Sequence, residues 1–218
     1  METGLFITLE GGDGSGKSTQ VRLLGNRIRR LNIPLTMVRE PGGTPLGNRL
    51  RRLLKFSTTP LIKEAELLLF NASRAQLVRD IIRPSLDDGN VVLCDRFYDS
   101  TMAYQGYGRG IPLEQVEMVN SIATGGLKPD LTILLDLLPE EGMLRWSIGR
   151  DRFESGFEQK INTDFHHKVR QGYMNLAHKE PERWFIVDAR SSKAEISSLI
   201  WERVGLLLES KCQRLAPE

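Results

Sequence analysis

The sequence predicts an α/β protein in which helices cover both faces of a parallel sheet. Short apolar runs alternate with longer stretches of helical periodicity, which is typical of βαβ units. The runs lack the in-and-out alternation of a solvent-facing sheet, so both faces of each strand should be covered. The first run leads directly into a glycine-rich loop and a helical stretch. Strands are therefore expected at residues 5–10, 34–38, 90–94, 131–135 and 184–187.

Helices are expected between these strands, and one more follows the last strand. The stretch 63–83 has a helical pattern, and Pro84 is expected to end it because proline lacks the N–H that a helix interior needs. The apolar stripe within 193–211 is expected to be a packing face without a functional role. No repeat or linker divides the chain, so one domain over residues 1–218 is predicted. Further helices are expected over 19–31 and from near Pro139 and Phe157.

The composition is that of an ordinary globular protein. Thirty Lys and Arg residues nearly balance 28 Asp and Glu residues, which argues against general binding to nucleic acids or membrane surfaces. No apolar run approaches the roughly 18 residues of a membrane span, and the chain enters a strand too early for a signal peptide. Cys94 and Cys212 form no disulfide or metal-binding pattern. We therefore expect a reduced, cytoplasmic protein.

A phosphate-binding loop follows the first strand. Residues 11–18 read Gly-Gly-Asp-Gly-Ser-Gly-Lys-Ser, which fits G-x-x-x-x-G-K-[ST] between a strand and a helix. Loop N–H groups and the helix N-terminus attract the phosphates of a nucleoside triphosphate. Lys17 should reach the β and γ phosphates, and the Ser18 hydroxyl should bind Mg²⁺. The expected binding residues are Gly11, Gly12, Asp13, Gly14, Ser15, Gly16, Lys17, Ser18 and Thr19.

Charged residues follow two other strands at the same expected sheet edge, where open α/β sheets bind ligands. Asp95 either holds Mg²⁺ or its waters, or caps the next helix. Arg96 can grip a phosphate through its planar fork. Arg39 lies correspondingly after the second strand, before a turn containing Pro-Gly-Gly.

Two further segments could hold the rest of a ligand. Phe70 and Arg74 are four residues apart on a helix and share a face, which suits a stacked base and its carbonyl edge; a core Phe with a surface Arg is the alternative. Residues 104–110 form a polar, glycine-rich loop with two tyrosines. Residues 147–156, rich in Arg, Asp, Gly and Ser, are either a solvated connection or a mobile lid that supplies an arginine.

Together these residues resemble the thymidylate kinase family, over nearly the whole chain and in one unbroken order. The resemblance rests on the phosphate loop with Asp13 inside it, Arg39-Glu40-Pro41-Gly42-Gly43-Thr44, Phe70 with Ser73-Arg74-Ala75-Gln76, Asp95-Arg96-Phe97, Ala103-Tyr104-Gln105-Gly106, Lys128-Pro129-Asp130-Leu131-Thr132, Leu135-Asp136, Asp151-Arg152-Phe153-Glu154 and Val187-Asp188-Ala189.

The resemblance implies transfer of the ATP γ-phosphoryl group to dTMP with Mg²⁺, giving dTDP and ADP. It also implies a homodimer and the three-layer nucleoside monophosphate kinase fold, with a five-stranded parallel sheet and a short lid at about residues 145–157. Ser18 and Asp95 would hold the metal. The implied dTMP contacts are Asp13 at the 3′-hydroxyl, Arg39 and Arg96 at the phosphate, Phe70 stacked on thymine, Arg74 at its carbonyl, Thr101 and Gln105 at the nucleoside, and Tyr104 at the 2′ position.

The family places its catalytic arginine either in the phosphate loop or in the lid. Here the loop position is Gly14, whereas the lid carries Arg150 and Arg152, so the chain resembles the lid type. The implied catalytic set is Lys17, Asp95, Arg96 and these two arginines, either of which could act. Two rival interpretations remain: a kinase for another nucleoside monophosphate, and a nucleotide-binding switch protein without kinase activity, although no Asn-Lys-x-Asp motif is present.

Overall fold

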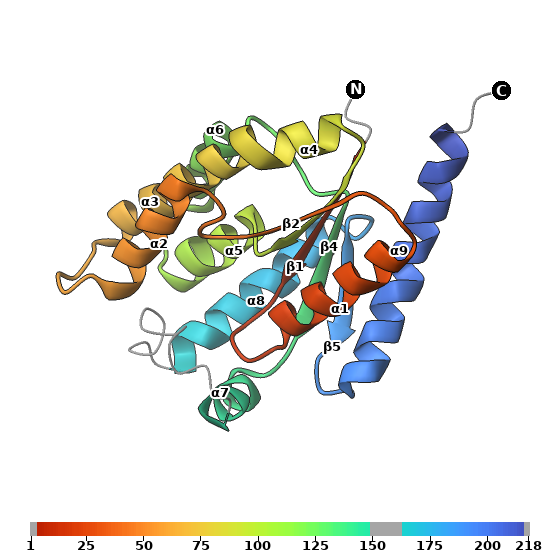
Figure 1. Ribbon diagram of the computed structural model, residues 1–218. Helices are drawn as coiled ribbons and strands as arrows, with labels where there is room; N and C mark the ends of the chain where they lie inside the picture. Colours follow the sequence, from red (N-terminus) through yellow and green to blue (C-terminus); the bar gives the residue numbers. More distant parts are fainter. Residues whose placement is uncertain (1–3, 149–162, 216–218) are drawn as a thin grey trace.

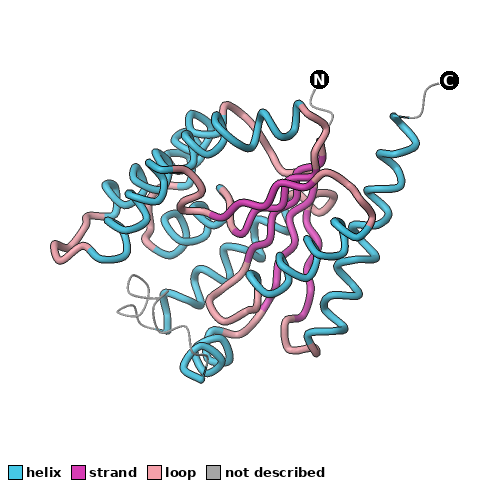
Figure 2. Tube along the Cα trace, viewed as in Figure 1, coloured by secondary structure: helices cyan, strands magenta, loops and turns pink. Residues whose placement is uncertain are grey.

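One parallel sheet lies at the centre of the structure (Figures 1 and 2). A computed structural model describes residues 4–148 and 163–215. Within them, five strands are ordered β2-β3-β1-β4-β5, all parallel. The expected fold class and all five expected strands are confirmed, each end within one residue. The strands are β1 Leu5–Glu10, β2 Leu35–Arg39, β3 Val91–Asp95, β4 Leu131–Asp136 and β5 Trp184–Asp188.

Helices cover both faces of the sheet. Helices α1 and α9 lie side by side over one face, and the other helices that pack on the sheet lie over the opposite face (Figure 1). The described chain contains no helix long and apolar enough to cross a bilayer. The helices are α1 Lys17–Arg30, α2 Pro45–Phe56, α3 Lys63–Leu77, α4 Arg83–Asp87, α5 Tyr98–Thr101, α6 Leu113–Thr124, α7 Pro139–Ile148, α8 Thr163–Lys179 and α9 Lys193–Leu215, with π-helical segments η1 Val78–Ile82 and η2 Met102–Gly108.

The core follows from the two-residue period of β1. Leu5, Ile7 and Leu9 point to one face and join the apolar stripes of α1 and α9, so the expected packing role of the last helix is confirmed. Phe6 points to the other face and packs with the segment from α3 to α4. Glu10, at the end of β1, points to this second face too and is fully buried. The strand therefore places a carboxylate beneath the phosphate loop.

Pro84 does not end a helix, so that prediction is wrong. The chain turns from α3 through η1 directly into α4, which continues to Asp87. Pro84 is the second residue of α4 and directly follows the π-helical turn of η1. The wider π-helical turn of η1 before it accommodates the proline ring.

The expected glycine-rich loop at 104–110 is also wrong, because residues up to Gly108 are π-helical in η2. Its glycines serve close packing. A Cβ on Gly108 would lie 2.5 Å from the Phe165 ring, and a Cβ on Gly172 would lie 2.7 Å from the Tyr107 ring. A glycine on each of η2 and α8 thus packs against an aromatic ring of the other helix, and the two helices approach closely.

Strand order explains why functional residues gather at one edge. β1 lies between β3 and β4; the chain leaves β1 toward β2 on one side, and the connection after β3 crosses to β4 on the other side. In the sheet register, Asp95 lies beside Leu9 of β1 and beside Arg39 of β2. The loop after β1 and the residues that follow β2 and β3 therefore meet at the carboxyl edge.

Candidate active site

The phosphate loop joins β1 to α1 in the expected place. Lys17 begins α1 with its side chain largely buried, and its Nζ donates hydrogen bonds to Gly12 O at 2.7 Å and Ser15 Oγ at 3.3 Å. Gly16 precedes the helix at φ 94°, a left-handed conformation that glycine adopts without strain. No side chain caps this helix N-terminus, and its first turn carries no acid. Its N–H groups are therefore suited to an anion.

Ser18 and Asp95 meet across the edge of the sheet. The Ser18 hydroxyl donates a 2.6 Å hydrogen bond to Asp95 Oδ2. Asp95 does not cap α5, whose N-cap residue is Phe97, so the capping alternative is wrong. A hydroxyl and a carboxylate oxygen are hard donors of the kind Mg²⁺ accepts together with substrate phosphates. No cluster of three His, Cys, Asp or Glu side chains suited to a metal occurs in the described part of the chain.

Arg96 connects the phosphate loop to the second face of the sheet. Its backbone has φ 70°, which is unusual for a residue with a side chain. Its guanidinium lies 5.1 Å from the centroid of the Tyr104 ring and forms an ion pair of 2.7 Å with Asp13. The guanidinium donates hydrogen bonds to Gly11 O, Asp13 Oδ1, Ser100 Oγ, Tyr104 OH and Tyr173 OH. Three residues expected from sequence, Asp13, Arg96 and Tyr104, are thus in direct contact.

Glu10 and Tyr173 belong to the same cluster and were missed by the sequence analysis. Glu10 accepts hydrogen bonds from Phe97 N, Ser100 Oγ and Tyr173 OH. Burial, with a smaller contribution from Asp99, raises the pKa of Glu10 to about 7. Glu10 breaks an apolar run and could have been noticed. Nothing in the sequence connects it with Tyr173, 163 positions later.

The raised pKa of Glu10 predicts a pH-dependent stability. Because the folded-state pKa exceeds the usual 4.5, the native state binds the proton more tightly, and stability should fall as pH rises from about 4.5 to 7. A shift of this size corresponds to about 3 kcal/mol. Urea unfolding of wild type and Glu10→Gln at several pH values tests this, because the variant lacks the titrating group. Parallel stability profiles would contradict the prediction.

Phe70 and Arg74 share a face of α3, as expected, but Arg74 is not on the surface. Its side chain is 2% exposed, so the surface-arginine alternative is wrong. Phe70 is half-buried. The five N–H groups of Arg74 donate hydrogen bonds of 2.6–3.0 Å to Glu40 Oε2, Asn71 Oδ1, Asn120 Oδ1 and Thr101 Oγ1, with Glu40 accepting two. A bond from Arg74 to a base carbonyl therefore requires one of these hydrogens to be shared.

Gln105 lies on η2, where it is buried against α3. Its Nε2 donates a 2.8 Å hydrogen bond to Glu66 Oε1, and Arg109 donates to both oxygens of the same carboxylate. Glu66 was also missed by the sequence analysis, although an acid four residues before Phe70 on the same helix face was a visible signal. The remaining expected residue, Arg39, is exposed at the end of β2, beside Asp95 in the sheet register.

The sequence model of the family described as Thymidylate kinase matches residues 9–200. The chain belongs to the thymidylate kinase family. It is 48% identical over 207 residues to a thymidylate kinase of Dehalococcoides mccartyi, covering 94% of this chain and 98% of that protein. It is 45% identical to the thymidylate kinase of Deinococcus radiodurans, with the same two coverages. The crystal structure of thymidylate kinase from Ehrlichia chaffeensis superimposes with a TM-score of 0.75 and 33% identity, over 92% of this chain and 98% of that one.

The two arginines assigned to the lid, Arg150 and Arg152, lie outside the described residues. Helix α7 ends at Ile148 and α8 begins at Thr163, so most of the segment 145–157 and the helix start expected near Phe157 lie there too. Arg145, at the near end of the segment, donates a 2.7 Å hydrogen bond to Ala189 O.

Helix α7 packs directly against the phosphate loop through two glycines. A Cβ on Gly14 would overlap the carbonyl oxygen of Gly142, and one on Gly142 would overlap the carbonyl oxygen of Asp13. Gly14 also has φ 71°, which disfavours any larger residue. The loop position after Asp13 therefore has no room for an arginine.

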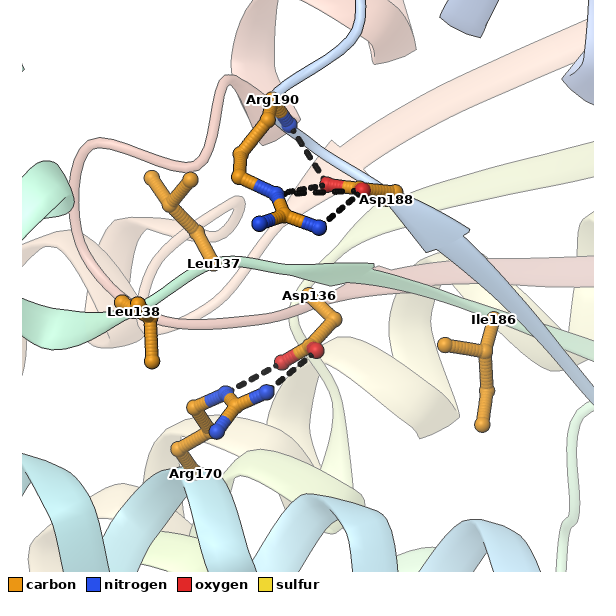
Figure 3. Close-up of a pocket in the computed structure, with 7 residues that line it drawn as sticks. All are labelled: Asp136, Leu137, Leu138, Arg170, Ile186, Asp188 and Arg190. Carbon is orange, nitrogen blue, oxygen red and sulfur yellow. Dashed lines mark hydrogen bonds and ion pairs between the residues drawn. The ribbon is translucent and has the colours of Figure 1, made fainter.

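A cavity of about 230 Å³ lies at the carboxyl ends of β4 and β5 (Figure 3), and none of the expected substrate residues lines it. Its charged groups are paired with one another: Arg170 forms two 2.7 Å hydrogen bonds to Asp136, and Arg190 pairs with Asp188. Each arginine points toward the carboxylate with which it is paired, Arg170 toward Asp136 and Arg190 toward Asp188 (Figure 3). The cavity is lined by Asp136, Leu137, Leu138, Arg170, Ile186, Asp188 and Arg190.

Proposed function

We propose that this chain transfers the γ-phosphoryl group of ATP to the 5′-phosphate of dTMP, giving dTDP and ADP. The observation that carries the proposal is the contact between Asp13, inside the phosphate loop, and Arg96, the arginine expected to grip dTMP. Two sets of anion-binding groups thereby meet at one sheet edge. A donor and an acceptor phosphate can then be held close enough to react.

The chemistry needs positioning and charge stabilisation more than a base. A dTMP phosphate oxygen attacks the γ-phosphorus while the bond to the bridging oxygen of ADP breaks. The attacking phosphate is already largely anionic at pH 7, because its second pKa is about 6. Lys17 would hold the β and γ phosphates, and Arg39 and Arg96 would hold the acceptor phosphate. These cations offset the repulsion between two polyanions.

We propose Mg²⁺ as the metal, held by Ser18 and Asp95 together with ATP phosphates. The hydrogen bond between these two side chains supports the proposal, since it brings two hard oxygen donors to the loop. When bound, Mg²⁺ neutralises charge on the β and γ phosphates. Ser18 would hold the metal from the first turn of α1, and Asp95 would hold it from the carboxyl end of β3.

The nucleoside would lie between α3 and the segment from α5 through η2. We propose that Phe70 stacks on thymine and that Arg74 contacts its carbonyl. Thr101 and Gln105 would complete the nucleoside contacts. The 3′-hydroxyl would meet Asp13, and Tyr104 would crowd the 2′ position. The direct contacts of Arg74 with Thr101 and of Arg96 with Tyr104 support this grouping.

We assign the catalytic arginine to the lid, as Arg150 or Arg152. The packing of Gly14 against Gly142 supports this, because it excludes an arginine from the loop position that serves other members of the family. A closed lid would also exclude water from the transferring group.

The double variant Arg150→Ala, Arg152→Ala should lower kcat by at least about a hundredfold while KM for dTMP changes little, because a lid arginine stabilises charge that develops in the transition state. Steady-state kinetics with varied dTMP measures both constants. The matched control is Arg29→Ala, Arg30→Ala, which removes two exposed arginines from the last turn of α1. A rise in KM alone would instead give the lid a binding role.

We further propose that the protein is a single-domain cytoplasmic homodimer. Helices α3 and α6 pack against each other and expose large apolar side chains: Leu68 is 58%, Met118 66% and Ile122 78% exposed. Exposed large apolar side chains on two helices that pack together are typical of an interface between subunits. Light scattering in solution gives the mass that tests the dimer.

The proposed activity is tested by ADP release with ATP and Mg²⁺ across dTMP, dUMP, UMP, CMP, dCMP, AMP and GMP. We expect dTMP to give the highest kcat/KM and dUMP to be turned over more weakly, since one methyl group is worth about 1–3 kcal/mol. Preference for another acceptor would overturn the assignment of the base. Nucleotide binding without turnover of any acceptor would favour the switch protein.

A further inference from the structure

Glu66 is a buried carboxylate to which the proposed reaction gives no role. It is 3% exposed and lies on α3 one turn before Phe70, on the face that also carries Arg74. Burial of a carboxylate is costly unless its charge is paired and hydrogen-bonded. Its partners therefore indicate what it is for.

The partners of Glu66 belong to a second row of residues, which has the same four-residue spacing as Glu66, Phe70 and Arg74 on α3. Thr101, Gln105 and Arg109 follow one another at intervals of four along the segment from α5 to the residue after η2. Glu66 bonds Gln105 and Arg109, and Arg74, two turns further along α3, bonds Thr101. The two rows run alongside each other in opposite directions, and the proposed base contacts are among their members.

The chemistry of the Glu66–Gln105 bond determines which way the Gln105 amide points. A carboxylate only accepts hydrogen bonds, so it selects the NH₂ end of the amide and turns the carbonyl oxygen away. The two ends have nearly the same shape, and packing alone would not distinguish them. Within the described chain, Gln105 Oε1 makes no hydrogen bond. The amide therefore has one unused acceptor with a defined orientation.

We propose that Glu66 is a specificity-determining positioning residue, which holds the Gln105 amide so that its carbonyl oxygen accepts the N3–H of thymine. The inference rests on the proposed function and extends it to the choice of base. Cytosine has a lone pair at N3 in place of a hydrogen, and two acceptors facing each other repel. Arg74 offers only donors, and all five of its N–H groups are used, whereas Gln105 Oε1 is an acceptor that an N–H of the base could use.

The test compares kcat/KM for dTMP and dCMP in wild type and Glu66→Gln. A glutamine at 66 can donate or accept, so Gln105 can adopt either orientation. The ratio of dTMP to dCMP should fall by about tenfold or more, mainly through KM for dTMP, because a hydrogen bond to a charged group is lost. The matched control is Glu64→Gln, the same change at an exposed carboxylate on the same helix, which should leave the ratio unchanged.

A second pair of variants separates base selection from stability. The single variant Glu66→Gln leaves the Arg109 guanidinium without its carboxylate partner. The double variant, Glu66→Gln with Arg109→Gln, removes both charges. The double variant therefore provides a test even if the single variant does not fold. Arg109→Gln alone keeps the Glu66–Gln105 bond and should keep the wild-type ratio, whereas the double variant should lose it.

The outcomes for the base and for the proposed function are distinct. If wild type prefers another acceptor over dTMP, the proposed function fails. If wild type prefers dTMP but the variants lacking Glu66 keep the wild-type ratio of dTMP to dCMP, the role of Glu66 is overturned and the function stands. A uniform loss of kcat with both acceptors, at an unchanged ratio, would likewise reduce Glu66 to a structural residue.

Discussion

Lys17→Ala should lower kcat by about a hundredfold to a thousandfold while the protein stays folded. The Lys17 side chain is the cation of the phosphate loop, and its Nζ is held by Gly12 O and Ser15 Oγ at the start of α1. Lys17 is a fixed positive charge close to where negative charge develops in the transition state, and removing such a charge lowers kcat by a factor of this size. Gly12 O and Ser15 Oγ, which lose the lysine in this variant, are uncharged, so the protein should still fold.

The measurement is kcat at saturating ATP and dTMP, with circular dichroism and thermal unfolding as the check on folding. Lys168→Ala, at an exposed lysine of α8, is the matched control and should keep wild-type kcat. A nearly normal kcat in Lys17→Ala would contradict the role assigned to the loop lysine.

Arg183→Met should cost about 3–5 kcal/mol of unfolding free energy, because it leaves a buried carboxylate unpaired. Arg183 donates hydrogen bonds to both oxygens of Asp99, and its guanidinium lies near the rings of Tyr98 and Trp184. Asp99 is 1% exposed. Burial raises the pKa of Asp99, and the Arg183 guanidinium opposes that rise. Without Arg183, the cost of burial is uncompensated.

Urea unfolding measures the loss. The matched control is Arg190→Met, which breaks the exposed pair with Asp188 and should change the midpoint little. Asp99→Asn combined with Arg183→Met removes both charges and should recover part of the stability. Equal midpoints for the Arg183 and Arg190 variants would contradict the prediction.

The strands were predictable because each is a short, mainly apolar run, whereas their order depends on contacts between runs far apart in the chain. The positions of the phosphate loop, Asp95 and Arg96 were predictable for a related reason. Each lies at or directly after the end of a strand, and parallel strands bring their carboxyl ends to one edge. Local chemistry together with one general rule of topology was sufficient there.

What sequence reasoning missed lies in contacts between distant segments. The pKa of Glu10 is raised by burial beside α5 and α8, and Glu66 acquires its partners from the packing of α3 on η2. The glycines of η2 favoured a loop in the prediction because glycine is common both in flexible turns and at close helix contacts. Only the facing rings of Phe165 and Tyr107 show that the second applies.

The cluster around Arg74 has a consequence for how this sequence can change over generations. The Arg74 guanidinium donates hydrogen bonds to residues of four segments: the residue after β2, α3, α5 and α6. Substitution of Glu40, Thr101 or Asn120 leaves a buried N–H of Arg74 without an acceptor. Once one acceptor has been lost, the loss of a second one costs less unfolding free energy. These positions, up to 80 residues apart in the chain, are therefore expected to drift together, as a correlated set among descendants of this sequence.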